Sequence, residues 1–249
     1  MGLTKGYQKN LLYSPKQVKQ EYFLSSATIQ WIVKEYKADY GDDLKGLADR
    51  VVIHINDTHP ALAIPEMMRI LMDEEGLGWD DAWSIVTKTF AYTNHTVMSE
   101  ALEKWPIYLF KPLLPRLYSI IVEINQRLME RLSRTYPGDR KKHEYMAIIS
   151  HNQINMANIC LAASFAVNGV SGLHTRILID DIFADYAKAE PERFHAITNG
   201  ITFRRWLHHA NPDYSKLITS RIGDSWLRDS KELSRLKPYA DDGEFRWLL

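Results

Sequence analysis

A nearly continuous run of apolar, mostly β-branched residues at positions 51–55, VVIHI, stands out along the chain. Such a run predicts a strand that a sheet buries on both faces. Polar and turn-forming residues follow at 56–60, NDTHP, and a helical apolar stripe then covers residues 64–71. Ligands of open α/β sheets bind outside the carboxyl ends of the strands. The pattern therefore predicts a site around Asp57 and His59.

Other stretches repeat apolar residues with a period near 3.6 and predict amphipathic helices. Prolines 106, 112 and 115 predict short pieces in their segment rather than one helix. Residues 194–197 are strand-like and run into an asparagine-glycine turn, and a further helix begins at Arg204. The charged tail, residues 230–249, is expected to be helical in part. The remaining predicted helices cover residues 15–36, 79–90, 116–133, 154–170 and 212–222.

Two segments carry polar groups whose roles the pattern leaves open. Residues 92–96, YTNHT, have no regular period, and we interpret them first as a hydrogen-bond network that fixes a buried turn. Residues 172–175, GLHT, place His174 at a helix start or tight turn. A lone histidine there is more often a structural capping residue than a catalytic one. Asp57 beside His59 indicates an orienting pair or a strand-end carboxylate that holds loop amides.

Composition narrows the classes of protein. The 249 residues are 45% hydrophobic, enough for a sizeable core. Lys+Arg and Asp+Glu are equal at 31 each, which argues against nucleic acid or an anionic membrane as partner. A single cysteine, Cys160, excludes an internal disulfide and fits a reducing compartment. The N-terminus has no apolar signal-peptide region, and polar residues interrupt the longest apolar runs. We expect a cytoplasmic α/β protein without a membrane span.

Familiar catalytic motifs do not occur. The chain has no glycine-rich phosphate loop, no Walker pattern, no zinc motif and no G-x-S-x-G elbow. We therefore predict no metal site. His208 and His209 occupy adjacent helical positions, face different ways and are expected to be solvated. The residues alone thus indicate an α/β domain with a polar cleft at its strand ends.

Several long motifs extend this picture. They are KQEYFLSSATIQ at 19–30, INDTHPALAIPEMMRIL at 55–71, YTNHTVMSEALEKWP at 92–106, EINQR at 123–127, INMANIC at 154–160, AVNGVSGLHTRIL at 166–178 and ITNGITFRRWL at 197–207. In order and spacing the chain resembles the α-glucan phosphorylases, which act on glycogen, starch and maltodextrin. The resemblance covers residues 15–249.

The resemblance implies a reaction and a fold. Members of that family cleave α-1,4-glucosidic bonds with inorganic phosphate and release glucose 1-phosphate, with the phosphate of pyridoxal phosphate as a proton relay. The implied fold is a Rossmann-like half of a two-domain B-type glycosyltransferase fold, truncated at both ends. Residues 1–198 would be the later part of the N-terminal catalytic domain. Residues 199–249 would begin the C-terminal, cofactor-binding domain, which is incomplete.

Site residues carry over by position. His174 matches the histidine that binds the 6-hydroxyl of the reacting glucosyl unit, and its carbonyl would stabilise the developing oxocarbenium ion. Asn199 matches an asparagine that binds the same hydroxyl. Trp206 matches a tryptophan near the cofactor, and Asp57 and His59 match residues on the floor of the cleft. These are positioning and electrostatic roles, in agreement with the absence of a nucleophile.

Departures from the family pattern also matter. The segment with the cofactor lysine, of the type E-A-S-G-T-x-N-M-K, does not occur here. We therefore expect the isolated chain to bind no cofactor and to be inactive, whereas the full-length protein would be a homodimer acting on α-1,4-glucan and phosphate. Phe203 stands where many members have proline. Lys34 and Glu35 replace two arginines of the regulated animal enzymes, which argues against control by nucleotide or phosphoserine. The alternative is a non-catalytic glucan-binding or assembly module derived from a phosphorylase.

Overall fold

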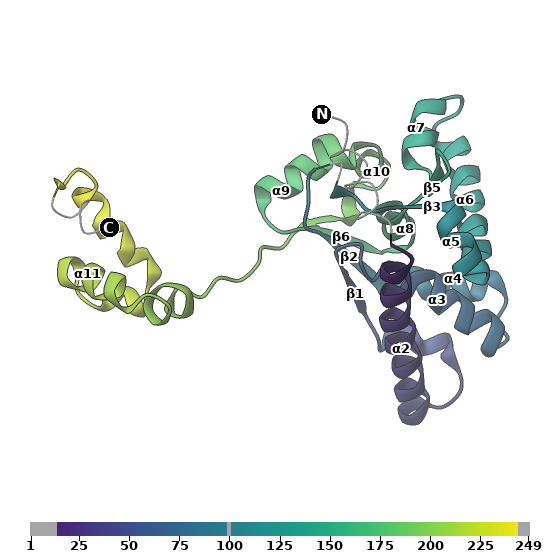
Figure 1. Ribbon diagram of the computed structural model, residues 1–249, viewed down its shortest axis with the longest axis horizontal. Helices are drawn as coiled ribbons and strands as arrows, with labels where there is room; N and C mark the ends of the chain where they lie inside the picture. Colours follow the sequence, from purple (N-terminus) through teal and green to yellow (C-terminus); the bar gives the residue numbers. More distant parts are fainter. Residues whose placement is uncertain (1–13, 99–100, 244–249) are drawn as a thin grey trace. The chain divides into compact units, whose positions relative to one another are not determined.

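The computed structural model describes residues 14–98 and 101–243 (Figure 1). The chain divides into two compact units: the first ends at Thr198 and the second begins at Asn199. Each unit buries an apolar cluster of its own. Each therefore has the hydrophobic centre that a folding unit needs.

A parallel sheet, ordered β1-β2-β6-β7, forms the centre of the first unit. Ile55, Tyr92 and Val167 lie side by side across its first three strands and are fully buried. Helices connect the strands, as parallel pairing requires. The predicted α/β class is confirmed. The strands are β1 (Ile53–Asn56), β2 (Phe90–Asn94), β6 (Ala166–Gly169) and β7 (Phe194–Ala196).

The first strand differs from its prediction in position and burial. It begins at Ile53 rather than Val51, and only Ile55 is buried, while His54 is exposed and Val52 is 65% exposed. The expectation that it is covered on both faces is wrong within this structure. Within the described residues only one face of β1 is covered: Ile55 is buried, whereas His54 and Asn56, which point to the opposite face, are exposed.

Helices of the first unit surround this sheet. Ser14 caps the long helix α2 (Pro15–Tyr40), its Oγ accepting from the Lys16 amide at 3.2 Å. Helix α2 packs against α3, and α3 against α4 and α6 (Figure 1). Within residues 14–98 and 101–243, no helix is both long and apolar enough to cross a membrane. The other bounds are η1 (Leu44–Asp49), α3 (Ala63–Arg69), η2 (Ile70–Glu74), α4 (Trp79–Thr89), α5 (Ile107–Leu113), α6 (Pro115–Thr135), α7 (Arg140–Met146), α8 (Met156–Ala163), α9 (Gly172–Ile177), η4 (Leu178–Ile182), α10 (Ala184–Ala189) and η5 (Pro191–Arg193).

The helix predicted over residues 154–170 is wrong in extent. Its first residues belong to strand β5, only α8 is helical, and residues 166–169 form β6. The helix ends because Ser164 is extended, and the Phe165 amide donates to the Phe90 carbonyl at 2.9 Å. Pairing with β2 thus decides the conformation of an apolar run that periodicity cannot assign.

The polar-aromatic patch at 92–96 also differs from its prediction. Residues 90–94 form β2, so the buried turn is wrong, although the expected hydrogen-bond network does exist around Asn94.

The prediction that prolines 106, 112 and 115 divide their segment into short pieces is confirmed, because α5 and α6 are separate helices. A small antiparallel sheet, which the sequence did not predict, joins β3 (Lys104–Pro106), β5 (Gln153–Asn155) and β4 (Ile149–Ser150).

The second unit is small and helical. Its core consists of Ile218, Ile222 and Trp226, and the Trp226 indole donates to the Thr219 hydroxyl at 3.2 Å. The predicted helix over 212–222 is confirmed, and the helical part of the tail ends at Tyr239; residues 244–249 lie outside the described part. The elements are η6 (Arg204–His209), α11 (Pro212–Ile222), η7 (Ser225–Leu227) and η8 (Ser230–Tyr239).

Candidate functional site

Polar side chains collect where the parallel strands of the first unit end. Strand β1 ends at Asn56, β2 at Asn94 and β6 at Gly169, and these ends lie at the same edge of the sheet. Asp57 and His95 directly follow the first two strands. This edge is where open α/β sheets place their ligands.

Asp57 turns the chain sharply at the end of β1. Its φ is +63°, a left-handed conformation that is uncommon for residues other than glycine and costs about 1 kcal/mol. Hydrogen bonds hold it: its amide donates to the Thr93 carbonyl at 2.9 Å, and its Oδ1 accepts from the Thr58 amide at 2.7 Å. Asp57 thus holds a loop amide, as a strand-end carboxylate commonly does.

Asn94 and His174 form the buried centre of the edge. The Asn94 side chain donates to the Tyr92 hydroxyl at 3.1 Å, and its Oδ1 lies 3.1 Å from Nε2 of His174. The Val170 amide donates to Nδ1 of His174 at 3.0 Å. Because Nδ1 accepts, the ring proton belongs on Nε2, where it bonds to Asn94. Both ring nitrogens of His174 are therefore engaged within the protein.

The pKa of His174 agrees with a neutral ring. Burial lowers this pKa below its usual value, the backbone of Thr96 opposes the shift, and the charge of His95 adds to it. The His174 carbonyl accepts from the Leu178 amide inside the helical segment. His174 is thus tied at its ring and at its carbonyl, which favours a positioning role for it.

Close packing sets the position of His174. Ser171 caps α9, and its Oγ accepts from the His174 amide at 3.0 Å. A Cβ at Gly169 would lie 2.3 Å from Oγ1 and 2.9 Å from Cα of Thr175. Only glycine at the end of β6 lets α9 approach this closely.

His95 lies at this edge, directly after β2. Its imidazole is exposed, and its Nε2 lies 2.5 Å from Oδ1 of Asn56 at the end of the neighbouring strand. Sequence reasoning missed His95 by assigning its segment to a buried turn. The signal was present, since a polar residue directly after a buried strand belongs at the ligand edge of a sheet.

The predicted site residues fall into separate groups. Asp57 and His174 lie along the strand-end edge of the first unit. His59 is exposed in the turn after β1, beside two carboxyl groups described below. Asn199 is exposed and Trp206 is 67% exposed on η6, and both belong to the second unit. Their contacts with a ligand stay predictions.

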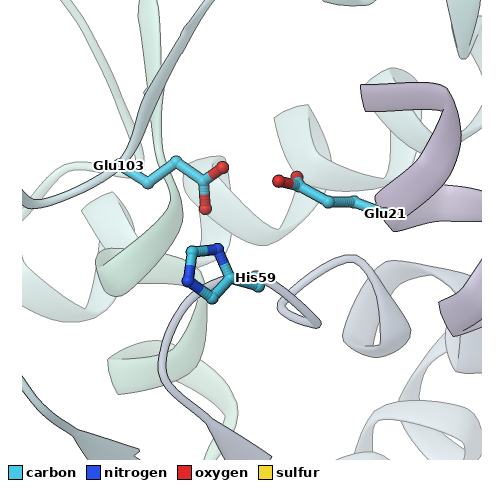
Figure 2. Close-up of side chains that lie close together, drawn as sticks. All are labelled: Glu21, His59 and Glu103. Carbon is cyan, nitrogen blue, oxygen red and sulfur yellow. The ribbon is translucent and has the colours of Figure 1, made fainter. Parts of the chain in front are cut away.

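A second cluster of polar side chains includes His59, in the turn after β1. Glu21 of α2, His59 and Glu103 point toward one another (Figure 2), with ligand-type atoms all within 4.8 Å. Burial, followed by the charge of Glu103, raises the pKa of Glu21 to about 8. Sequence reasoning missed this cluster because its members are far apart in the chain.

The structure defines an α/β protein with a parallel sheet, whose polar groups collect at the edge where such sheets place their ligands. A family model described as carbohydrate phosphorylase matches residues 14–248. The chain is 51% identical to a glycogen phosphorylase of Bacillus subtilis over 229 residues, and 46% and 45% identical to the muscle forms of Bos taurus and Homo sapiens over 239 residues. The chain belongs to the carbohydrate phosphorylase family.

These relatives are considerably longer. Each alignment covers 92% of this chain but only 29% of the bacterial protein and 28% of each muscle protein. The matched residues include most of the first unit and nearly all of the second. The resemblance inferred from the motifs is therefore confirmed as family membership, and the activity of the whole protein is a matter for proposal.

Proposed function

We propose that this chain is a central part of an α-1,4-glucan phosphorylase, in which the first unit supplies one wall of the glucan cleft. The observation that supports this most strongly is the family match over nearly the whole chain, together with the polar strand-end edge it contains. The reaction of the full-length protein would be phosphorolysis of α-1,4-glucan to glucose 1-phosphate. The 249-residue chain alone would not catalyse it.

Within that wall, we assign sugar contacts by exposure. A glucosyl hydroxyl needs a donor or acceptor that is free to face it. The exposed His95 meets this condition better than the half-buried His174, whose ring nitrogens bond to Val170 and Asn94. Asp57 is half-buried, and one of its oxygens accepts from the Thr58 amide. In this proposal His174 orients Asn94, and a direct bond from His174 to the 6-hydroxyl would require Asn94 to give up its own. Asn199 stays a glucan contact predicted from the motif alone.

The cofactor implied by the family is pyridoxal phosphate, and the residues of this chain do not fit it by themselves. Trp206 is 67% exposed, and Arg204 and Arg205 beside it are exposed as well. No lysine lies in a segment of the family's cofactor type. We therefore assign no step of the reaction to the cofactor in this chain and propose that the isolated chain does not retain it.

Two further properties belong to the full-length protein. We propose that it is a cytoplasmic homodimer, as the family resemblance implies.

The single cysteine of this chain, Cys160, is buried in α8, and its burial raises the pKa of its thiol well above the usual value. A buried thiol of this kind is chemically unreactive.

Glucan titration followed by amide NMR tests the site assignment. Maltoheptaose should shift the amides of residues 56–59 and 94–96 of the 249-residue chain, with an affinity on the order of 1 mM, about −4 kcal/mol. The β-1,4-linked cellohexaose is the matched control and should leave them in place. His95→Gln should weaken the shifts several-fold, because it removes an exposed imidazole.

An activity assay tests the second half of the proposal. With phosphate, maltoheptaose and added pyridoxal phosphate, the chain alone should release no glucose 1-phosphate. Release at any sustained rate would refute the proposed inactivity. Shifts confined to other parts of the chain would refute the strand-end assignment.

A further inference from the structure

We propose that Glu21, His59 and Glu103 form a binding site for one divalent transition-metal ion of the Zn²⁺ type. The three residues come from helix α2, from the turn after β1 and from the segment before β3. Each offers one ligand atom, and these atoms all lie within 4.8 Å of one another (Figure 2). Metal binding here would need no glucan, although His59 is also predicted to lie on the floor of the glucan cleft.

Glu103 is oriented by donors on both of its oxygens. The Thr58 hydroxyl donates to Oε2 at 2.9 Å, and the buried Trp105 indole donates to Oε1 at 3.0 Å. Each oxygen keeps a second lone pair for a cation. Hydrogen-bonded carboxylates of this kind are typical supports of metal sites, because the donors fix the ligand's direction.

Glu21 presents an oxygen that the protein does not satisfy. Its Oε1 accepts from the Gln17 side chain at 2.9 Å, while its Oε2 is inaccessible to solvent and has no hydrogen-bond partner among the described residues. A buried acceptor without a donor costs about 1–3 kcal/mol. Either a proton shared with Glu103 or a bound cation would satisfy it. Burial raises the pKa of Glu21, and the neighbouring charge of Glu103 adds to the shift.

His59, the third member of the cluster, favours a bound cation over a shared proton. A shared proton needs only the two carboxyl groups, whereas His59 adds an exposed imidazole within the same radius. One imidazole and two carboxylates suit Zn²⁺ or a similar ion, while Mg²⁺ and Ca²⁺ take oxygen ligands. Zinc bonds of about 2.0–2.2 Å would draw the ligand atoms to roughly 3.4 Å apart, leaving one position for water. The flexible side chains of Glu21 and His59 allow this approach.

Calorimetric titration of the 249-residue chain with ZnCl₂ in metal-free buffer tests the site. We expect one saturable site per chain, and at least a tenfold loss of affinity in His59→Ala. His59 is exposed, so this variant should fold normally. The matched control is His151→Ala, since His151 is also exposed and lies 3.0 Å from an exposed carboxylate, Glu144. The control should change the affinity less than twofold.

Glu21→Gln supplies a second variant that keeps the shape of the side chain and should also lose at least tenfold in affinity. An excess of MgCl₂ should not displace the zinc. Absence of saturable binding, or equal binding by wild type, His59→Ala and Glu21→Gln, would overturn the proposal and leave a carboxyl pair that shares a proton. A loss in His151→Ala equal to that in His59→Ala would overturn it as well.

Discussion

Two glutamates at the contact between α2 and the rest of the first unit, Glu66 and Glu21, have opposite surroundings. Glu66 on α3 is fully buried, yet it receives two hydrogen bonds from Arg69, each 2.8 Å long, and one from the Ser26 hydroxyl at 2.7 Å. Glu21 on α2 faces a second carboxyl group, Glu103, and one of its oxygens has no donor. Both sites join α2 to the body of the first unit.

The difference separates a structural carboxylate from a candidate binding group. A buried charge is tolerated where a cation and hydrogen-bond donors surround it, and Glu66 has both. Negative charges that face each other without a cation are costly, so such sites are candidates for function. The same substitution, glutamate to glutamine, should therefore have opposite effects at the two positions.

The largest effect is expected for Glu66→Gln. Glutamine removes the negative charge opposite Arg69 and places an amide donor against the guanidinium. Breaking a buried ion pair from one side costs about 3–5 kcal/mol, and we expect about 3 kcal/mol here, since Arg69 keeps a second partner, Glu74, at 2.7 Å. Urea unfolding monitored by hydrogen exchange of α2 and α3 measures this loss.

Arg69→Met provides the reciprocal test, because it leaves the carboxylate of Glu66 without its cation. It should destabilise the same helices by a similar amount. A loss below about 1 kcal/mol in both variants would mean that the Ser26 and Tyr22 hydroxyls satisfy Glu66 without help from the guanidinium.

The next largest effect is a pH-dependent stabilisation by Glu21→Gln. The folded state raises the pKa of Glu21 from its ordinary value of 4.5 to about 8, so between these values the folded state binds more protons than the unfolded state. Wild-type stability must then fall as pH rises through this window. Glutamine keeps a donor for Glu103 at every pH. Because Glu21 is partly exposed, solvent screening reduces the gain at pH 9 to about 1.5 kcal/mol.

Urea unfolding at pH 4, 7 and 9, with EDTA present to remove metal ions, measures this gain. The variant and the wild type should be nearly equal at pH 4 and should diverge as pH rises. Equal stability at pH 9 would show that folding does not raise the pKa of Glu21, and a lower stability of the variant at every pH would reverse the proposed sign.

The sequence predicted the parts of the fold that depend on local pattern. The apolar periodicity of α6 and the proline at the start of α2 fix these helices without reference to the rest of the chain. Strand β6 could not be predicted in this way, since its alanine-rich, apolar segment suits a helix as well as a strand. Pairing of Phe165 with Phe90, a contact distant in sequence, makes the choice.

The same distinction applies to the candidate site: local sequence pattern predicts some of its residues and not others. Asp57 was predictable because a polar residue directly follows an apolar, strand-like run, and His95 follows β2 by the same rule. Glu21 and Glu103 could not be predicted. Their approach depends on how α2 packs beside the turn that carries His59, and no local pattern encodes that packing. Family motifs marked the region but not these partners.

The smallest effect is expected for Tyr22→Phe, which tests how much of the Glu66 site depends on a single weak donor. The Tyr22 hydroxyl lies 3.3 Å from Oε2 of Glu66, at the long end of hydrogen-bond distances, and Arg69 already donates to the same oxygen. We expect a loss of about 0.5 kcal/mol in urea unfolding. Tyr108→Phe, at a 78% exposed position on α5, is the control and should change nothing measurable. A loss above 2 kcal/mol for Tyr22→Phe would place the hydroxyl, rather than the guanidinium, at the centre of the site that stabilises Glu66.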